Sequence, residues 1–182
     1  THAQNFVLPC VSNSVLPDLY LKLQELNMAR PVSGLLTDMV CCPGGDFCSL
    51  ANARSITVAE DINRRYKSLD KLESLGNIDL RISGCMNSCG HHHIGNIGIL
   101  GVDKDGKAFY QLLLGGNSGE KGKASLGKII AKAFAEDEIS DAVENILQHY
   151  LSKRDKNETF RNTVARLGNA SFAEAANKAR KS

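Results

Sequence analysis

Several stretches of the chain carry the hydrophobic pattern of β-strands. Apolar and polar side chains alternate over residues 78–82, as in a strand with one buried face. Two longer apolar runs follow at 97–102 and 108–114, and an Asp-Gly pair at 105–106 is typical of the tight turn of a hairpin. A short apolar run at 6–8 favours one more strand. The pattern therefore predicts a sheet around the middle of the chain.

Helical periodicity dominates elsewhere. It predicts helices over residues 17–28, 47–69, 140–153, 157–167 and 171–181. Ser140 and Ser171 are suitable N-caps, Glu174 completes a capping box with Ser171, and Gly168 is a suitable stop. Cys48 would lie in the first turn of the second helix, where the helix dipole favours a thiolate.

Glycine-rich segments separate these elements. Residues 42–46 and 83–93 are expected to be irregular loops, as are 115–116 and 119–122, because Gly and Pro interrupt regular structure. Strands are thus concentrated in the middle of the chain and helices in its last third. This organisation is typical of the α+β class.

Composition narrows the class of protein. The chain has 182 residues, of which 42% are hydrophobic and 23% charged, so a globular core can form. The net charge of +2 and the absence of Trp do not favour a nucleic acid as partner, and no apolar run approaches the ~20 residues that cross a bilayer. We expect a cytoplasmic protein. Since the chain begins with Thr1 and not with Met, we expect a processed chain or a fragment of a longer one.

Four of the six cysteines form two pairs in glycine-flanked loops. Five residues separate Cys42 from Cys48, three separate Cys85 from Cys89, and 36 residues lie between the pairs. Loops of this kind can surround an iron–sulfur cluster, because glycine lets backbone N–H groups approach the sulfur atoms. A [4Fe–4S] cluster takes four thiolates, which is the number of cysteines in the two pairs.

Other interpretations of the cysteines remain open. Zinc sites favour pairs separated by two to four residues, which suits the second pair and fits the first poorly. Disulfides are not excluded by the spacing, and a radical-SAM cluster lacks its third cysteine because His92 stands in that place. Cys10 is interpreted as an ordinary free thiol, and Cys41 as a packed free thiol beside Cys42.

Two segments resemble the paired signature of sirohaem-dependent sulfite and nitrite reductases. They run from Cys42 to Ala51 (Cys-Pro-Gly-Gly-Asp-Phe-Cys-Ser-Leu-Ala) and from Ile82 to Gly90 (Ile-Ser-Gly-Cys-Met-Asn-Ser-Cys-Gly). Weaker similarity continues at 97–98, 114–116, 158–160 and 166–168, and so covers most of the chain.

The resemblance implies a fold and a domain division. It implies an α+β domain with a central mixed sheet and flanking helices, preceded by the end of a ferredoxin-like half-domain. Residues 1–30 are expected to be that end, 31–155 the sirohaem/[4Fe–4S] domain, and 156–182 a C-terminal helical extension.

The resemblance also implies the residues of the site. Cys42, Cys48, Cys85 and Cys89 are the expected ligands of the [4Fe–4S] cluster, and Cys89 also bridges to the sirohaem iron. Asn87, between the last two cysteines, and Gln4 and Asn5, which end a Thr-x-x-Gln-Asn pattern, are expected to contact sirohaem. Local hydrogen bonding is an equally good role for Asn87. His91, His92 and His93 are expected to be solvent-facing or to line the loop, not to be catalytic.

The implied activity is the six-electron reduction of sulfite to sulfide or of nitrite to ammonia. The electron donor would be ferredoxin or a flavoprotein reductase, and the N-terminal half of the enzyme would be a further partner, with neither nucleic acid nor membrane involved. Without that half, we expect this chain to be inactive and able to lack either cofactor. The alternative is a non-catalytic iron–sulfur or zinc protein that serves electron transfer or structure.

Overall fold

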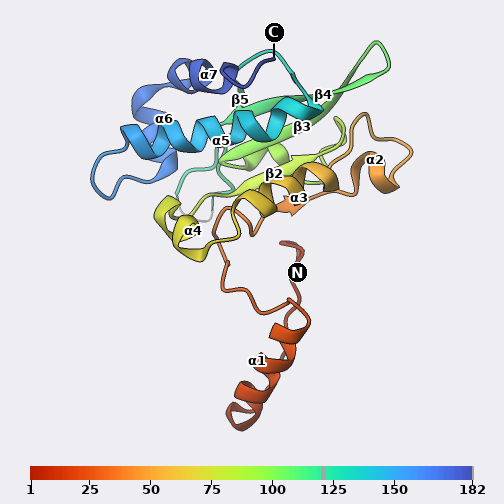
Figure 1. The fold of residues 1–182 in the computed structure, drawn as a ribbon, viewed down its shortest axis with the longest axis vertical. Coiled ribbons are helices and arrows are strands. Elements are labelled where there is room, and N and C mark those ends of the chain that lie inside the picture. Colours follow the sequence, from red (N-terminus) through yellow and green to blue (C-terminus); the bar gives the residue numbers. More distant parts are fainter. Residues whose placement is uncertain (120–121, 182) are drawn as a thin grey trace.

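A mixed sheet forms the centre of the molecule, which we describe from a computed structural model for residues 1–119 and 122–181. Its strands β1 (Val40–Cys41), β2 (Leu80–Ser83) and β3 (Ile97–Lys104) are parallel neighbours. Strand β4 (Lys107–Leu114) pairs antiparallel with β3, and it pairs on its other side with β5 (Lys128–Ile129) and β6 (Phe134–Ala135). The β3–β4 hairpin is visible in green in Figure 1.

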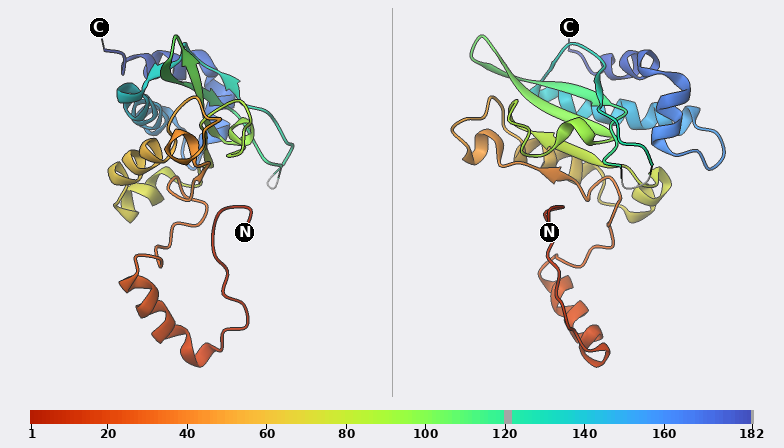
Figure 2. Two further views of the ribbon diagram at one scale, coloured as in Figure 1. Left: turned by 90° about the vertical axis from the view of Figure 1, so that its right-hand side faces the viewer. Right: turned by 180° about the vertical axis from the view of Figure 1, so that it is seen from behind.

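Helices cover this sheet. Helix α3 (Ile56–Arg65) and helix α5 (Glu136–Lys153) lie side by side over the sheet, with the short helix α4 (Leu69–Leu75) after α3 (Figures 1 and 2). Helices α6 (Phe160–Leu167) and α7 (Asn169–Asn177) pack against α5. The predicted central mixed sheet with flanking helices is therefore confirmed.

One apolar core joins these layers. Ile82 and Ile99 of the sheet, Ile62 of α3, Ile146 of α5 and Phe172 of α7 are each at most 1% exposed and belong to the same cluster of buried residues. At roughly 25 cal/mol for each Å² of apolar surface removed from water, burial of such side chains is the main stabilising contribution. The predicted domain boundaries at residues 30/31 and 155/156 stay predictions.

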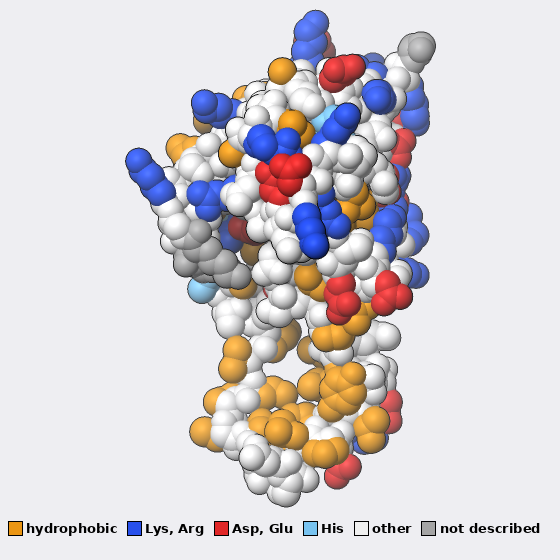
Figure 3. Space-filling model, turned by 90° about the vertical axis from the view of Figure 1, so that its left-hand side faces the viewer, with side chains coloured by type: hydrophobic (Ala, Val, Ile, Leu, Met, Phe, Trp, Pro, Cys, Tyr) orange, Lys and Arg blue, Asp and Glu red, His pale blue; other side chains and the backbone are white. Residues whose placement is uncertain are grey.

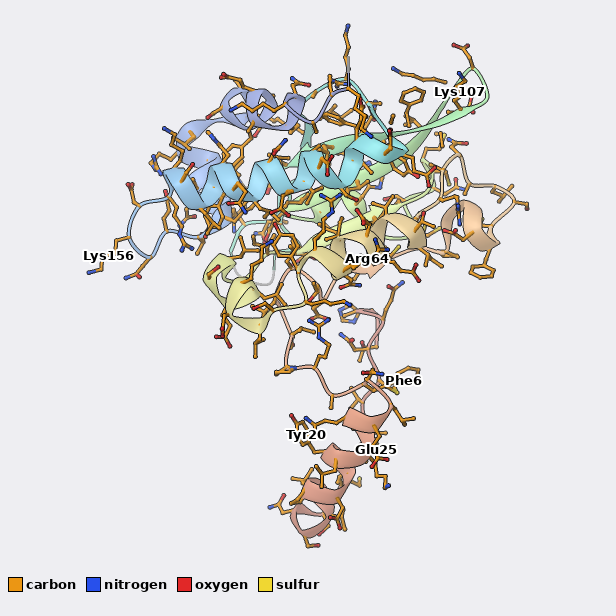
Figure 4. All side chains as sticks on the ribbon, in the orientation of Figure 1. Phe6, Tyr20, Glu25, Arg64, Lys107 and Lys156 are labelled. Atoms are coloured by element: carbon orange, nitrogen blue, oxygen red, sulfur yellow. The ribbon has the colours of Figure 1, made fainter. Side chains whose placement is uncertain are left out.

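Residues 1–30 form an arm whose first residues lie beside the body and whose helix points away from it (Figure 1), and we call it the N-terminal arm. It contains the single-turn helix η1 (Asn13–Val15) and helix α1 (Leu16–Glu25), which has no buried residue. Phe6 and Tyr20 lie on this arm (Figure 4), and apolar side chains gather over it in the space-filling view (Figure 3). Phe6 is 86% exposed.

The strands predicted over 78–82, 97–102 and 108–114 are confirmed as β2, β3 and β4. The strand predicted at residues 6–8 is wrong, since this segment is exposed and pairs with no described strand. This short apolar run has no sheet edge to join. The turn at residues 105–106 is confirmed, with Gly106 at φ +76°. Of the loop predicted over 119–122, residues 120 and 121 lie outside the described part of the chain.

The long helix predicted over residues 47–69 is wrong. The chain forms a one-turn helix α2 (Gly44–Phe47), then an irregular segment, then the separate helices α3 and α4. The reason is tertiary. The backbone N–H groups of Asn52 and Ala53 donate to Gly84 O at 2.9 and 3.0 Å, so they are not available for helical hydrogen bonds. The loop predicted over 42–46 is correct only for its first residues, because α2 begins at Gly44.

Both predicted N-caps near the C-terminus are wrong. Ser140 lies inside α5, which begins four residues earlier, where the Glu138 side chain accepts a hydrogen bond from Ala135 N at 2.9 Å. Ser171 lies inside α7 and is 2.7 Å from His149 Nε2. Gly168 ends α6 at φ +77°, as predicted.

Within the described residues, no helix combines the length and the apolar character needed to cross a membrane.

Candidate metal centre

The two cysteine loops leave neighbouring parallel strands at the same edge of the sheet. Cys42 directly follows β1, and Cys85 lies two residues beyond the end of β2. The ladder continues into the first loop, where Cys42 N donates to Ile82 O at 3.1 Å. Because the carboxyl ends of adjacent parallel strands meet, this edge brings the loops together, and it is also where open α/β sheets bind ligands. We call the loops 42–55 and 84–90 together the cysteine edge.

Residues 52–56, at the end of the first loop and the start of α3, hold the two loops together, which the sequence analysis did not predict. Besides the bonds from residues 52 and 53 to Gly84, Gly45 N donates to Ala53 O at 2.8 Å. Tyr110 of β4 donates its hydroxyl to Arg54 O at 2.8 Å. The segment is therefore hydrogen-bonded to both loops and to the sheet. The sequence offered only a weak signal for it, a serine just before a helical run.

Asp46 fixes the first loop to the start of α3. Its carboxylate accepts hydrogen bonds from Arg54 Nε at 2.8 Å, Ser55 N at 3.2 Å and Ile56 N at 3.0 Å. Desolvation opposes ionisation, but these hydrogen bonds outweigh it and hold the pKa of Asp46 below its ordinary value. Asp46 thus caps α3 from a distance in sequence, which explains why that helix begins at Ile56.

The sulfur of Cys42 lies in the interior and has two potential hydrogen-bond donors. Gly84 N donates to Cys42 Sγ at 3.1 Å, and Ser55 Oγ lies 3.6 Å from the same sulfur. Cys42 and Cys85 are each 8% exposed, whereas Cys48 is half-buried and Cys89 is exposed. The four predicted ligands therefore range from the interior to the surface of one edge.

The predicted position of Cys48 is corrected by the structure. Cys48 is the C-cap of α2, and its N–H donates to Gly44 O at 2.8 Å. A dipole from the N-terminus of a following helix cannot act there, because α3 starts eight residues later. The thiolate argument based on that dipole is therefore wrong.

Close approach of backbone segments explains the glycines. A Cβ on Gly90 would lie 2.0 Å from Ile82 O, and one on Gly84 would lie 2.7 Å from Ala53 O. No other residue fits these positions without movement of the backbone. The glycines let the loop of Cys85 and Cys89 lie directly against β2 and the 52–56 segment.

Cys41 differs from its neighbour. Its thiol donates to Cys42 O at 3.2 Å, and burial, followed by the charges of Cys42 and Asp46, raises the pKa of Cys41 to about 12. It therefore stays a protonated thiol at neutral pH, in keeping with a packing role.

The three histidines directly follow the loop of Cys85 and Cys89 in the sequence, and two of them contact Ser88 of that loop. His92 is fully buried in the single turn η2 (His92–Ile94), and both His92 Nδ1 and His93 Nδ1 lie close to Ser88 Oγ, at 3.2 and 3.0 Å. Burial, and then the neighbouring His93, lowers the pKa of His92 to about 4. His92 is therefore a neutral residue of the interior. His91 and His93 are exposed, as is Asn87.

Gln4 connects the N-terminal arm to the end of β1, next to the cysteine edge. Its side-chain amide donates to Cys41 O at 2.8 Å and accepts from Cys41 N at 2.9 Å, as a neighbouring strand would. Asn5 Nδ2 donates to Asp38 Oδ1 at 2.9 Å. Gln4 and Asn5, which are both predicted to contact sirohaem, thus have hydrogen-bond partners within the chain. The partner of Gln4 is Cys41, the residue next to Cys42. Contact of Gln4, Asn5 and Asn87 with sirohaem stays a prediction.

The donor set fits an iron–sulfur cluster. In residues 1–119 and 122–181, no group of three or more His, Cys, Asp or Glu side chains is placed around a point where one metal ion could bind. A cube-shaped cluster makes a different demand, because each of its four irons takes one thiolate and the ligands lie around a larger body. Thiols at the ends of β1 and β2, glycines that admit close backbone and a sulfur that already accepts an N–H bond all fit such a group.

Comparison with known proteins identifies the family. Residues 35–182 match the model of the family described as the nitrite and sulphite reductase 4Fe-4S domain. The chain belongs to this family, whose domain carries a [4Fe–4S] cluster.

The relatives are long enzymes. The chain is 32% identical over 152 residues to a ferredoxin–nitrite reductase of Leptolyngbya laminosa, covering 81% of this chain and 29% of the relative. It is 28% identical over 171 residues to sulfite reductase [ferredoxin] 1 of Mycolicibacterium paratuberculosis, covering 88% of this chain and 30% of the relative. The chain thus spans less than a third of the length of these relatives.

Solved structures show the same fold. The NirA protein of Mycobacterium tuberculosis superposes with a TM-score of 0.71 at 25% identity, covering 89% of this chain and 31% of that one. A dissimilatory sulfite reductase I superposes with a TM-score of 0.72 at 13% identity, covering 92% of this chain and 58% of that one, which concerns the fold alone.

Proposed function

We propose that this chain is the C-terminal, cluster-bearing part of a sirohaem- and [4Fe–4S]-dependent sulfite or nitrite reductase. The reaction is the six-electron reduction of sulfite to sulfide or of nitrite to ammonia. The observation that carries the proposal is the placement of two glycine-flanked cysteine loops side by side at the ends of β1 and β2. Relatives named as ferredoxin-dependent nitrite and sulfite reductases support it.

In this proposal the four cysteines have distinct positions in one site. Cys42 and Cys85, which are buried, would hold the cluster from the interior, and Cys48 would hold it from a half-buried position. Cys89, which is exposed, would be the ligand shared with the sirohaem iron. When bound, the two cofactors supply the electron storage and the iron at which the anion is reduced. The chain supplies thiolates, fixed backbone N–H groups and the burial that tunes their potential.

The N-terminal arm is where we expect the rest of the enzyme to contact this chain. Phe6, Leu21 and Leu26 are 86, 57 and 66% exposed, a density of apolar surface that marks interaction sites. The N-terminal half would also bring basic side chains for the carboxylates of sirohaem. The chain by itself is accordingly expected to be inactive and able to lose either cofactor.

The remaining assignments follow from the same proposal. The electron donor is ferredoxin or a flavoprotein reductase, the substrate is sulfite or nitrite, and the protein is cytoplasmic. Two relatives are named as ferredoxin-dependent enzymes, which supports ferredoxin as the donor. A third relative, 28% identical over 173 residues, is a sulfite reductase [NADPH] haemoprotein β-component of Nitrobacter winogradskyi, which supports the flavoprotein reductase as the other candidate.

Anaerobic reconstitution of the chain with iron and sulfide, followed by metal analysis, EPR and absorption spectra, tests the proposal. Chain produced together with the N-terminal half and with sirohaem should show sirohaem absorption and reduce sulfite or nitrite with reduced methyl viologen. Iron binding without sirohaem absorption or anion reduction would favour the alternative, a non-catalytic iron–sulfur protein. Zinc in place of iron would contradict the cluster itself. Substitution of Cys42, Cys48, Cys85 or Cys89 by Ser should lower the iron content, and Cys10→Ser is the matched control, since Cys10 is exposed on the arm.

A further inference from the structure

Ser55 is a buried polar residue beside a proposed ligand. Its side chain is 0% exposed, although it precedes α3 in a segment between two loops. Its hydroxyl oxygen lies 3.6 Å from Cys42 Sγ. A hydroxyl removed from water requires a hydrogen-bond partner, and the sulfur of Cys42 is within reach.

The direction of this hydrogen bond depends on the state of the cysteine. Between a neutral thiol and a hydroxyl, either atom could donate the proton. A cysteine that ligates a metal is a thiolate and has no proton, so it can only accept. In a cluster-loaded protein Ser55 must therefore be the donor, and the sulfur of Cys42 then accepts from both Ser55 and Gly84 N.

The surroundings of Ser55 hold the hydroxyl in place. Ser55 N donates to Asp46 Oδ2 at 3.2 Å, and the preceding carbonyl of Arg54 accepts from Tyr110. Two glycines leave the space that the hydroxyl occupies, because a Cβ on Gly44 or Gly84 would lie 2.3 or 2.9 Å from Ser55 Oγ. The hydroxyl is thus preorganised toward the sulfur, and little ordering entropy is lost when the bond forms.

We propose that Ser55 donates a hydrogen bond to the Cys42 thiolate and thereby raises the reduction potential of the iron–sulfur cluster. The proposal rests on the assignment of Cys42 as a ligand in the proposed function. Reduction adds negative charge to the cluster and its sulfurs, so a donor to a ligand sulfur stabilises the reduced state more than the oxidised one. Ser55 is a positioning and tuning residue, and it does not contact substrate.

Redox titration of the cluster-loaded protein, followed by EPR, measures this effect. Ser55→Ala should lower the ratio of reduced to oxidised cluster about tenfold at a fixed ambient potential, which is ~59 mV for one electron. Ser55→Thr keeps the hydroxyl and should stay close to the parent protein. Ser140→Ala is the matched control, because Ser140 is a buried serine on α5 whose hydroxyl bonds to Asp61 and not to a cysteine.

A second readout does not depend on the potential. Pulsed EPR of the reduced parent protein in H2O and D2O should show an exchangeable proton coupled to the cluster that Ser55→Ala lacks and Ser140→Ala retains. An unchanged potential and an unchanged coupling in a loaded Ser55→Ala protein would overturn the proposal, as would equal shifts in Ser55→Ala and Ser140→Ala. If the chain binds no iron–sulfur cluster even when it is produced anaerobically together with the N-terminal half, the ligand assignment itself fails, and this proposal fails with it.

Discussion

The N-terminal arm and the cysteine edge differ in how far their residues are buried and hydrogen-bonded. The arm exposes apolar residues, and its helix α1 buries none. The cysteine edge also exposes apolar side chains, those of Phe47, Leu50 and Met86. It nevertheless buries Cys42, Ser55 and Gly84 and gives each of these a hydrogen-bond partner. The difference shows that the edge is held by contacts within this chain, whereas the arm lacks the contacts that would cover it.

A substitution that breaks the close packing of the cysteine edge should lower the free energy of unfolding most. Gly90→Ala places a Cβ about 2.0 Å from Ile82 O, so the loop of Cys85 and Cys89 must move away from β2. We expect a loss of about 3 kcal/mol or more in the free energy of unfolding, measured by urea denaturation. Gly106→Ala is the control with a positive φ and open space around its Cβ, and it should cost about 1 kcal/mol. Equal losses in the two variants would show that the contact with β2 is unimportant.

Acid should lower the free energy of unfolding through His92, which lies next to the cysteine edge in the sequence. The pKa of His92 is lowered from 6.5 to about 4 by burial, so the unfolded chain binds a proton in a range where the folded chain does not. This stability is fully present above pH 6.5 and is lost as the pH falls toward 4, by ~3 kcal/mol in total. Unfolding of the cluster-free chain at several pH values measures it. His92→Gln should flatten the profile in this range, whereas His91→Gln, at an exposed position, should leave it unchanged.

Removal of the Asp46 carboxylate should lower the free energy of unfolding by an intermediate amount. Asp46→Ala leaves Ser55 N and Ile56 N without their acceptor, and we expect a cost of about 2 kcal/mol. Because the pKa of Asp46 is lowered in the folded chain, its contribution is present above the unfolded pKa and is lost as the pH falls through the folded one. Amide exchange at Ser55 and Ile56 should become faster. Asp46→Asn keeps one acceptor oxygen, and exchange as fast as in the alanine variant would contradict this account.

Changes on the arm should have the smallest effect on stability. Leu21 is 57% exposed, so Leu21→Ser should change the free energy of unfolding by no more than about 0.5 kcal/mol. Leu36 is 0% exposed, and Leu36→Ala should cost ~2–5 kcal/mol. Thermal unfolding of both variants makes the comparison. A large loss in Leu21→Ser would mean that the arm packs against the body in solution.

The sequence predicted the parts of the molecule that depend on local pattern. Residues 78–82 and the hairpin around Asp105-Gly106 were recognised because alternation and turn chemistry act over a few residues. The helix predicted over 47–69 failed because Asp46 and Gly84 hold the backbone of residues 52–56 in another conformation. No local pattern carries that information.

The same limit applies to the candidate site. The spacing of the cysteine pairs indicated a cluster, and the resemblance to a known family implied the four thiols, because both depend on residues that lie close together in the sequence. The roles of Gln4 and Ser55 depend on contacts with partners 37 and 13 residues away, so only the folded structure could show them.

Anomalous diffraction at the iron edge from crystals of the cluster-loaded protein tests the central claim most directly. The account predicts four iron peaks in one compact group at the ends of β1 and β2, with one sulfur from each of Cys42, Cys48, Cys85 and Cys89 bound to a different iron. A single metal peak, or a cluster held by another set of side chains, would contradict it.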